Sequence, residues 1–338
     1  MKVLVYFQPS PKHDNFEGAR MRKVIKGALE VIDQKYTSNL YDEYDVAHFL
    51  SPEDESKLVI PLERKIPIIA SALFGEDDPA TRFLVHKNKG GKVITSLKPK
   101  ALRLLNKASL VLVPSISAKE LLIQNGVTSP IDIIVPGVNL ARFNFSREDE
   151  KELFYRYFRE DKNKKLVLAM GEYTNNMDGI SSLINAAKKR EDVEFYYIGC
   201  ETFAANYGNC KRIIKNAPKN VHFKTILPDD IYRSMLLNAD VFMLPGYNLS
   251  GVISVQEAMA ANCQLIVRQS AVYSELLVNK QTAYIADNSE TLTSLCLDYL
   301  DSKIKPTTEE AYNKISSYNL EKFGHELCDI YNSLVAKK

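Results

Sequence analysis

The chain has 338 residues, of which 45% are apolar and 25% charged, and a formal net charge of +2. This length exceeds what one hydrophobic core usually fills, so it predicts two domains, and the near-neutral charge gives no general reason to expect nucleic-acid binding. Five scattered cysteines without a CxxC pair argue against a zinc site or a disulfide framework. The apolar run in the N-terminal MKVLVYF is too short for a signal peptide, and no run reaches the ~18 apolar residues of a membrane span. We therefore expect a reduced, cytoplasmic protein.

Short apolar runs alternate with amphipathic patterns along the whole chain. A helical pattern at 19–34 follows the first apolar run. Strand-like runs of the first half lie at 2–7, 44–50, 66–74, 109–115 and 130–138. Those of the second half lie at 164–171, 193–199, 220–226, 240–246 and 264–269. Strands that alternate with helices form parallel sheets, so the pattern predicts an α/β protein with two Rossmann-like domains facing each other across a cleft.

The loops expected to line this cleft follow from the predicted topology. In open parallel sheets, ligands bind beyond the carboxyl ends of the strands. The expected lining loops are 7–18, 70–80, 171–179, 199–209 and 245–254. A charged, helical segment at 140–163 is expected to connect the two domains.

Four segments, in this order and spacing, carry a resemblance to a known family. They are ASLVLVPSISAKELLIQNGV at 108–127, IDIIVPGVNLARF at 131–143, LPDDIYRSMLLNADVFMLPG at 227–246, and VQEAMAANCQLIVRQSAVYSELL at 255–277. The chain resembles the retaining glycosyltransferases of family 4. MKVLVYF, YDVAHFL and KFGHELCDIYNSLV make it most similar to the bacterial diglycosyldiacylglycerol synthases.

This resemblance implies the GT-B fold and a division of the chain. Residues 1–139 would form an N-terminal Rossmann-like domain on the acceptor and membrane side, and 140–316 a donor-type Rossmann-like domain. Residues 317–338 would form a helix that crosses back to the first domain. The implied activity is transfer of a sugar from a UDP-hexose to a membrane glycolipid with retention, without a metal or cofactor, the UDP-sugar being a substrate.

A phosphate-binding turn is expected in MGEYTNNMDGISSLINAA at 170–187, where a strand, two glycines and a helix start follow one another. The resemblance implies an Arg or Lys pair in this loop, yet no cation lies between Lys165 and Lys188. The loop carries Glu172 and Asp178 instead, which would repel a diphosphate unless solvent or local lysines neutralise them. We therefore interpret the turn as a feature that persists because it belongs to the fold, although the positive charge that binds phosphate has been lost.

The family's E-x7-E pattern is half present. Glu257 matches the second Glu, which in the family holds the donor ribose, whereas Leu249 stands eight positions earlier and 247–255 contains no carboxylate. The alternative for Glu257 is a helix-capping or solvated side chain. Backbone N–H groups of 251–254 could still hold a phosphate at a helix start. The expected donor-binding residues are Glu257, Gly251, Val252, Ile253, Ser254, Gly171 and Ile226.

The first domain lacks the histidine that the diglycosyl-lipid branch carries before an acidic stretch. The corresponding segment 68–78 has Ser71, Ala72 and Leu73 at that place. His48 matches a strand-end histidine of the family and is interpreted as structural. The four other histidines show no pairing pattern and are interpreted as ordinary surface or fold residues. The expected acceptor and cleft residues are Gly18, Arg20 and Ser71.

A basic stretch lies between Pro79 and Ser109, with eight Lys or Arg residues and no acid. Leu97, Ala101, Leu104 and Leu105 give it an apolar face. The stretch predicts an amphipathic element on anionic lipid, and the alternative is a solvated helix packed on the sheet. The expected membrane contacts are Lys87, Lys89, Lys92, Lys98, Lys100 and Arg103.

Two principal functions remain open from the sequence. One is glycosyl transfer, and the other is a catalytically inactive pseudo-glycosyltransferase that stabilises or regulates an active one. A sugar- or nucleotide-binding sensor is a third. The expected partners are a nucleotide sugar, an anionic membrane lipid or glycolipid, and an active glycosyltransferase or a second copy, but no nucleic acid. The expected location is cytoplasmic, peripheral on the inner face of the cell membrane.

Overall fold

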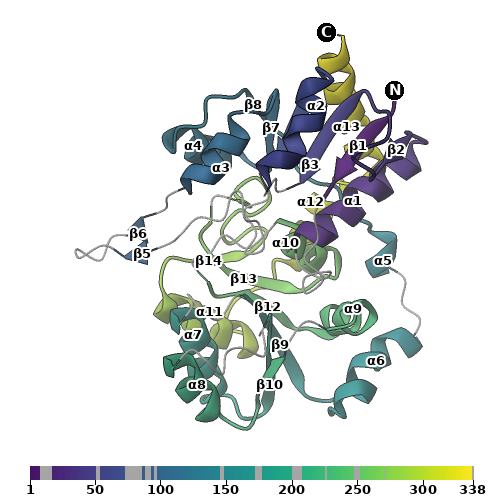
Figure 1. The fold of residues 1–338 in the computed structure, drawn as a ribbon. Coiled ribbons are helices and arrows are strands. Elements are labelled where there is room, and N and C mark those ends of the chain that lie inside the picture. The colour runs from purple at the N-terminus through teal and green to yellow at the C-terminus, as the bar shows by residue number, and fades with distance from the viewer. Residues whose placement is uncertain are drawn as a thin grey trace.

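The structure is a computed structural model. It describes residues 1–7, 17–50, 54–72, 86–87, 93–94, 97–144, 148–171, 177–199, 208–224, 227–246, 252–270 and 272–336. Within these residues the chain forms two six-stranded parallel sheets, each with its own helices, one above the other in Figure 1. This confirms the predicted α/β class with two Rossmann-like domains.

The first sheet has the strand order β2-β1-β3-β4-β7-β8, and its pairs are parallel. The strands are β1 (Val3–Tyr6), β2 (Tyr36–Thr37), β3 (Val46–Leu50), β4 (Ile68–Ser71), β7 (Leu110–Val113) and β8 (Ile131–Ile133). β3, β4 and β7 are buried along their whole length, because helices cover both faces of a parallel sheet. The near-continuous apolar runs of the sequence reflect this burial.

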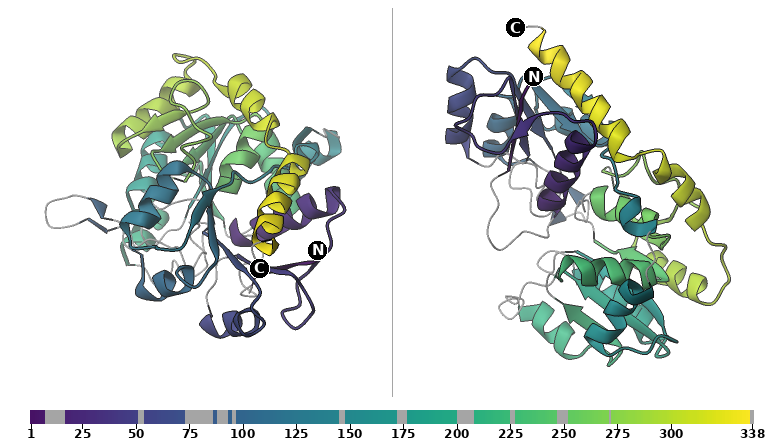
Figure 2. Two further views of the ribbon diagram at one scale, coloured as in Figure 1. Left: turned by 90° about the horizontal axis from the view of Figure 1, so that it is seen from above. Right: turned by 90° about the vertical axis from the view of Figure 1, so that its right-hand side faces the viewer.

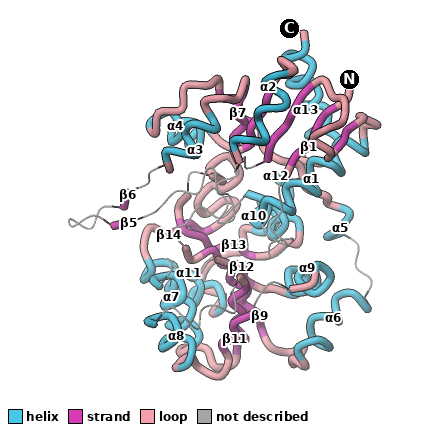
Figure 3. Tube along the Cα trace, in the orientation of Figure 1, coloured by secondary structure: helices cyan, strands magenta, loops and turns pink. Residues whose placement is uncertain are grey.

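The second sheet has the order β11-β10-β9-β12-β13-β14 and is also parallel. The strands are β9 (Lys165–Met170), β10 (Val193–Ile198), β11 (Val221–Lys224), β12 (Val241–Leu244), β13 (Gln264–Arg268) and β14 (Tyr284–Ala286). Figure 3 shows these strands as one magenta layer between helices. The short strands β2 and β14, and the antiparallel pair β5 (His86–Lys87) and β6 (Val93–Ile94), were not predicted.

The helices follow the strands as the alternating pattern predicts. Those of the first half are α1 (Glu17–Val31), η1 (Glu55–Leu58), α2 (Val59–Glu63), α3 (Pro99–Leu105) and α4 (Ile116–Gln124). The connecting segment holds α5 (Ala141–Asn144) and α6 (Glu148–Phe158). Those of the second half are α7 (Met177–Ala187), α8 (Gly208–Lys215), α9 (Asp229–Asn238), α10 (Val252–Ala260), α11 (Ser289–Leu300), α12 (Thr308–Ser316) and α13 (Leu320–Val335). Ser115, Asn288 and Asn319 cap α4, α11 and α13 with their side chains, which fixes where these helices begin.

The last helix, α13, packs against α1 and β3 of the first domain, and Figure 2 shows it running beside them. Gly324 makes this packing close, because a Cβ atom there would lie 2.5 Å from the backbone oxygen of Ala28. Leu327 and Tyr331 are fully buried on the same face of α13. The C-terminal helix is therefore part of the core beneath the first sheet.

Among the described helices, none combines the length and the apolar character that a bilayer span requires.

Candidate functional site between the two domains

The site begins where α1 of the first domain contacts α10 of the second. Arg20 lies in the first turn of α1, and Glu257 lies in α10, which follows β12 in the chain. The two side chains form a buried ion pair, with relative exposures of 7% and 6%. Arg20 also donates from Nη2 to Ser254 Oγ at 2.6 Å. The interpretation of Glu257 as a solvated side chain is therefore wrong, because the packing of α10 removes its carboxylate from water.

A second arginine extends this network along the connecting segment. Arg142, in α5, places Nη1 3.7 Å from Glu257 Oε1, and its Nη2 donates to Asp229 Oδ1 at 2.7 Å. Two guanidinium groups thus lie beside one buried carboxylate. Neither Arg142 nor Asp229 was singled out in the sequence, although Arg142 belongs to the crossover segment at 131–143.

The first turn of α10 presents the remaining donor-side residues. Val252 and Ile253 are buried apolar residues, and Ser254 is buried and bonded to Arg20. Gln256 is fully buried and donates from Nε2 to the backbone oxygen of Pro136, which ties α10 to the crossover. The expected donor residues Gly251 and Ile226 lie outside the described residues.

The phosphate turn is described only at its edges. Gly171 directly follows β9 and has φ at +150°, and a Cβ at Gly199 would lie 2.9 Å from the oxygen of Gly171. The two glycines therefore let the ends of β9 and β10 approach closely. Glu172 and the side chain of Asp178 lie outside the described part of the chain, so their charges are not placed.

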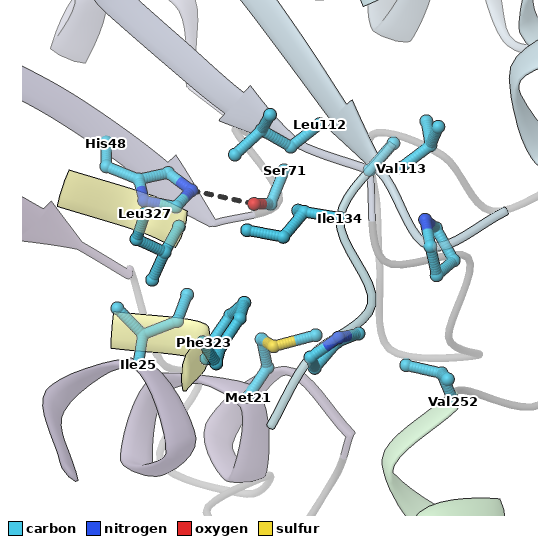
Figure 4. Close-up of a pocket in the computed structure, with 13 residues that line it drawn as sticks. Met21, Ile25, His48, Ser71, Leu112, Val113, Ile134, Val252, Phe323 and Leu327 are labelled. Atoms are coloured by element: carbon cyan, nitrogen blue, oxygen red, sulfur yellow. Dashed lines mark hydrogen bonds between the residues drawn. The ribbon is translucent and has the colours of Figure 1, made fainter. Parts of the chain in front are cut away.

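A hydrogen-bonded chain of three side chains lies on the first-domain side of the site, and Figure 4 shows its His48–Ser71 part. His48 Nε2 lies 2.7 Å from Ser71 Oγ, and His48 Nδ1 lies 2.8 Å from the hydroxyl of Tyr331. Burial lowers the pKa of His48 from 6.5 to about 3, because the charged imidazolium would lose its solvation. The histidine is therefore neutral at pH 7. Its two hydrogen bonds connect Tyr331 of α13, His48 of β3 and Ser71 of β4. This agrees with the structural role predicted for His48.

Ser71 opens into a pocket lined mostly by apolar side chains. Met21 of α1, Ile134, Val252 of α10 and Phe323 of α13 face it, so both domains contribute. Its cavity volume is about 20 Å³, room for roughly one water molecule. Of the expected cleft residues, Ser71 lines this pocket, Arg20 directly precedes Met21 in α1, and Gly18 is buried one turn before Met21.

The basic stretch is described mainly through α3. Lys98, Lys100 and Arg103 are exposed. The apolar residues Ala101, Leu104 and Leu105 are buried in the first domain, so the prediction that they form a lipid-facing stripe is wrong. Leu104 and Leu105 belong to the hydrophobic core, which removes them from water as a lipid surface would. Any lipid contact of α3 therefore depends on its charges. Of the other expected membrane residues, Lys89 and Lys92 and the side chain of Lys87 lie outside the described residues.

A second polar cluster lies at the amino-terminal ends of β10 and β11. His222 Nε2 lies 2.8 Å from Glu194 Oε2 and 3.8 Å from Glu160 Oε1, so His222 has partners that the sequence did not indicate. The three side chains are close enough to share a metal ion. Lys164 and the hydroxyl of Tyr196 already donate to the two carboxylates, which gives the cluster a structural role without a metal.

Comparison with known proteins identifies the family of this chain. Residues 150–319 match the family described as "Glycosyl transferases group 1". They make up half of the chain and include the whole second sheet and α10. The chain belongs to this family. The predicted family-4 resemblance is thereby confirmed.

Two curated relatives have related names. The chain is 24% identical over 340 residues, all of both chains, to a protein of Acholeplasma laidlawii named processive diacylglycerol alpha-glucosyltransferase. It is 25% identical over 179 residues to the alpha-galactosylglucosyldiacylglycerol synthase of Streptococcus pneumoniae, a match that covers 52% of this chain and 47% of that protein. Both relatives are thus named for the synthesis of glycolipids.

Solved structures support the GT-B fold across nearly the whole chain. HepE of Anabaena, solved with UDP and glucose, has a TM-score of 0.72 and 14% identity, with 98% of this chain and 100% of that chain covered. WaaG, a glycosyltransferase of lipopolysaccharide biosynthesis, has a TM-score of 0.63 and 12% identity, with 98% of each chain covered. At these identities the likeness shows the fold alone.

Proposed function

We propose that the protein transfers a hexose from a UDP-hexose to a membrane glycolipid, with retention of configuration. The observation that carries this proposal is the buried Glu257 carboxylate, held in α10 at the boundary of the two domains by Arg20. A fixed carboxylate is a strong acceptor for hydroxyl groups, and the family resemblance assigns this position to the donor ribose. The full-length relative named as a diacylglycerol glucosyltransferase supports a lipid acceptor.

The proposed site has two sides. The first turn of α10, with Val252, Ile253 and Ser254, and the glycine end of β9 would hold the nucleotide. Ser71 would face the acceptor from the first domain. The exposed cations Lys98, Lys100 and Arg103 of α3 would attach that domain to anionic lipid on the inner face of the cell membrane.

A second candidate is a non-catalytic partner that stabilises or regulates an active glycosyltransferase. Two observations favour it: the absence of a carboxylate at 247–255, and acids where the phosphate loop of the family carries cations. A diphosphate leaving group needs positive charge in its transition state, and removing such stabilisation costs orders of magnitude in rate.

Two measurements on the purified chain separate these functions. The first is calorimetric titration with UDP. The second is transfer of radiolabelled glucose or galactose from the UDP-sugar to a glycolipid in vesicles. Binding with transfer that Glu257→Ala abolishes supports the enzyme. Binding of UDP without transfer supports the partner function, and the absence of UDP binding removes the glycosyltransferase proposal.

A further inference from the structure

Arg20 belongs to the first domain, yet its guanidinium bonds three residues of the second. Its Nη1 donates to Glu257 Oε2 and, at 3.1 Å, to the hydroxyl of Tyr232, while Nη2 donates to Ser254 Oγ at 2.6 Å. Its guanidinium carbon lies 5.3 Å from the centre of the Tyr232 ring. These partners come from α9 and α10, so two helices of the second domain form a socket for a side chain of α1.

The hydrogen bond from Arg20 does not occupy all acceptor positions of the Glu257 carboxylate. An ionised carboxylate has about four lone-pair positions, and the hydrogen bond from Arg20 uses one of them. The contact with Arg142 is an ion pair at 3.7 Å, longer than a hydrogen bond. Among the described residues, Glu257 has no further side-chain hydrogen bond, so acceptor positions remain for two neighbouring hydroxyl groups of a sugar.

The direction of the Glu257 carboxylate depends on Arg20. A glutamate side chain has three rotatable bonds, and a pair of vicinal hydroxyls is bound well only if both oxygens are correctly aimed. The planar guanidinium of Arg20 fixes this aim, because it bonds Glu257 and Ser254 from two separate nitrogens. Since Arg20 comes from α1, Glu257 is held in this way only while α1 and α10 are in contact.

We propose that Arg20 is a positioning residue that reaches from the first domain to orient Glu257, so that contact between the two domains and binding of a ribose by Glu257 are coupled. This rests on the proposed function, since it takes Glu257 as the ribose acceptor. By linkage, a nucleotide that binds the oriented carboxylate favours the state in which α1 and α10 touch, to the same extent that this contact favours the nucleotide.

The test measures ribose recognition apart from nucleotide binding as a whole. Calorimetric affinities for UDP and 2′-deoxy-UDP are compared in the wild type, Arg20→Gln, Arg20→Lys and Glu257→Gln. The preference for UDP over its deoxy analogue reports the hydroxyl contact, because the base and the phosphates are common to both. Lys23→Gln is the matched control, since Lys23 is exposed on the same helix and loses the same charge.

We expect the wild type and Lys23→Gln to prefer UDP by roughly tenfold or more, the usual worth of a hydrogen bond to a charged group. Glu257→Gln should lower this preference to near unity, and Arg20→Gln should do the same although it leaves Glu257 in place. Arg20→Lys should give an intermediate preference, because a single ammonium cannot span both partners. Combining Arg20→Gln with Glu257→Gln should lower the preference no further.

Several outcomes would overturn the inference. An Arg20→Gln protein with the wild-type preference would show that Glu257 is aimed without Arg20. Tighter UDP binding by that variant would show that Arg20 blocks the carboxylate. If Arg20→Gln does not fold, Arg20→Lys decides alone, and a full wild-type preference in it refutes the need for a spanning guanidinium. A wild type that transfers sugar but has no preference for UDP removes the inference and leaves the proposed function, whereas a wild type that binds no UDP removes both.

Discussion

Lowering the pH from 7 to 5 should destabilise the protein through one buried side chain, His48. Burial lowers the pKa of this imidazole to about 3, against 6.5 for an ordinary histidine. Its two ring nitrogens face the uncharged hydroxyls of Ser71 and Tyr331, which cannot balance a positive charge. The unfolded chain therefore takes up a proton at His48 in this pH range, and the folded chain does not.

The size and sign of the effect follow from linkage. Because the folded pKa is depressed, His48 contributes stability above pH 6.5 that is lost as the pH falls towards 3. Between these limits the free energy of unfolding decreases by about 1.4 kcal/mol per pH unit for this one proton. At pH 5 the loss relative to pH 7 is about 2 kcal/mol, and this value requires only that the folded pKa lie below 5.

The assay is urea unfolding at pH 7 and pH 5 of the wild type, His48→Gln and His325→Gln. His48→Gln cannot take up this proton, so its loss of stability on acidification should be smaller than that of the wild type by about 2 kcal/mol. His325 is exposed on α13, and its substitution should leave the pH dependence of the wild type. Equal losses in the wild type and His48→Gln would refute the reasoning that burial keeps His48 neutral.

Three further predictions concern packing, lipid and nucleotide. Gly324→Ala should lower the unfolding free energy by roughly 1–3 kcal/mol, because the new Cβ would meet the Ala28 oxygen at 2.5 Å. Gly27→Ala, whose Cβ would lie 3.5 Å from Leu320, should be neutral or stabilising in the same urea titration. Replacing Lys98, Lys100 and Arg103 together by Gln should release the protein from anionic vesicles at low salt, at about 1 kcal/mol per residue. The same change at Lys188, Lys189 and Lys215 of the second domain should not, and equal sedimentation of both triple variants would contradict a role for α3. Glu172→Arg with Asp178→Lys should tighten UDP binding, most visibly at low salt, and an unchanged calorimetric affinity would end the charge argument.

The sequence alone was enough to predict the class of fold. The runs at 44–50, 109–115 and 240–246 each contain a strand, because an apolar run of this length bounded by polar residues fits a strand buried in a parallel sheet. Helix positions such as 19–34 followed from the period of apolar residues. These signals are local, so each can be recognised without knowing which segment packs against it. The short edge strands β2 and β14 lack such a run and were missed.

The candidate site was only half visible in the sequence. Glu257 and Arg20 were each named as candidate site residues, but nothing indicated that they pair, because they lie 237 residues apart. Likewise His48 could be assigned a structural role, but nothing near it indicated Tyr331, which is 283 residues away. Side-chain pairs between distant segments leave no periodic trace, because each partner is an ordinary polar residue in its own neighbourhood.

The tertiary structure also decided between interpretations that one pattern left open. The apolar face of α3 fits a lipid surface as well as it fits a sheet, since both environments simply exclude water. Packing against the first domain buries Ala101 and Leu104 and leaves Lys100 and Arg103 outside. For Glu257, solvation and burial were equally compatible with the sequence, and the contact between α1 and α10 determined that the carboxylate is buried and paired. The amphipathic period determines which residues share a face, but only the arrangement of the whole chain determines what that face meets.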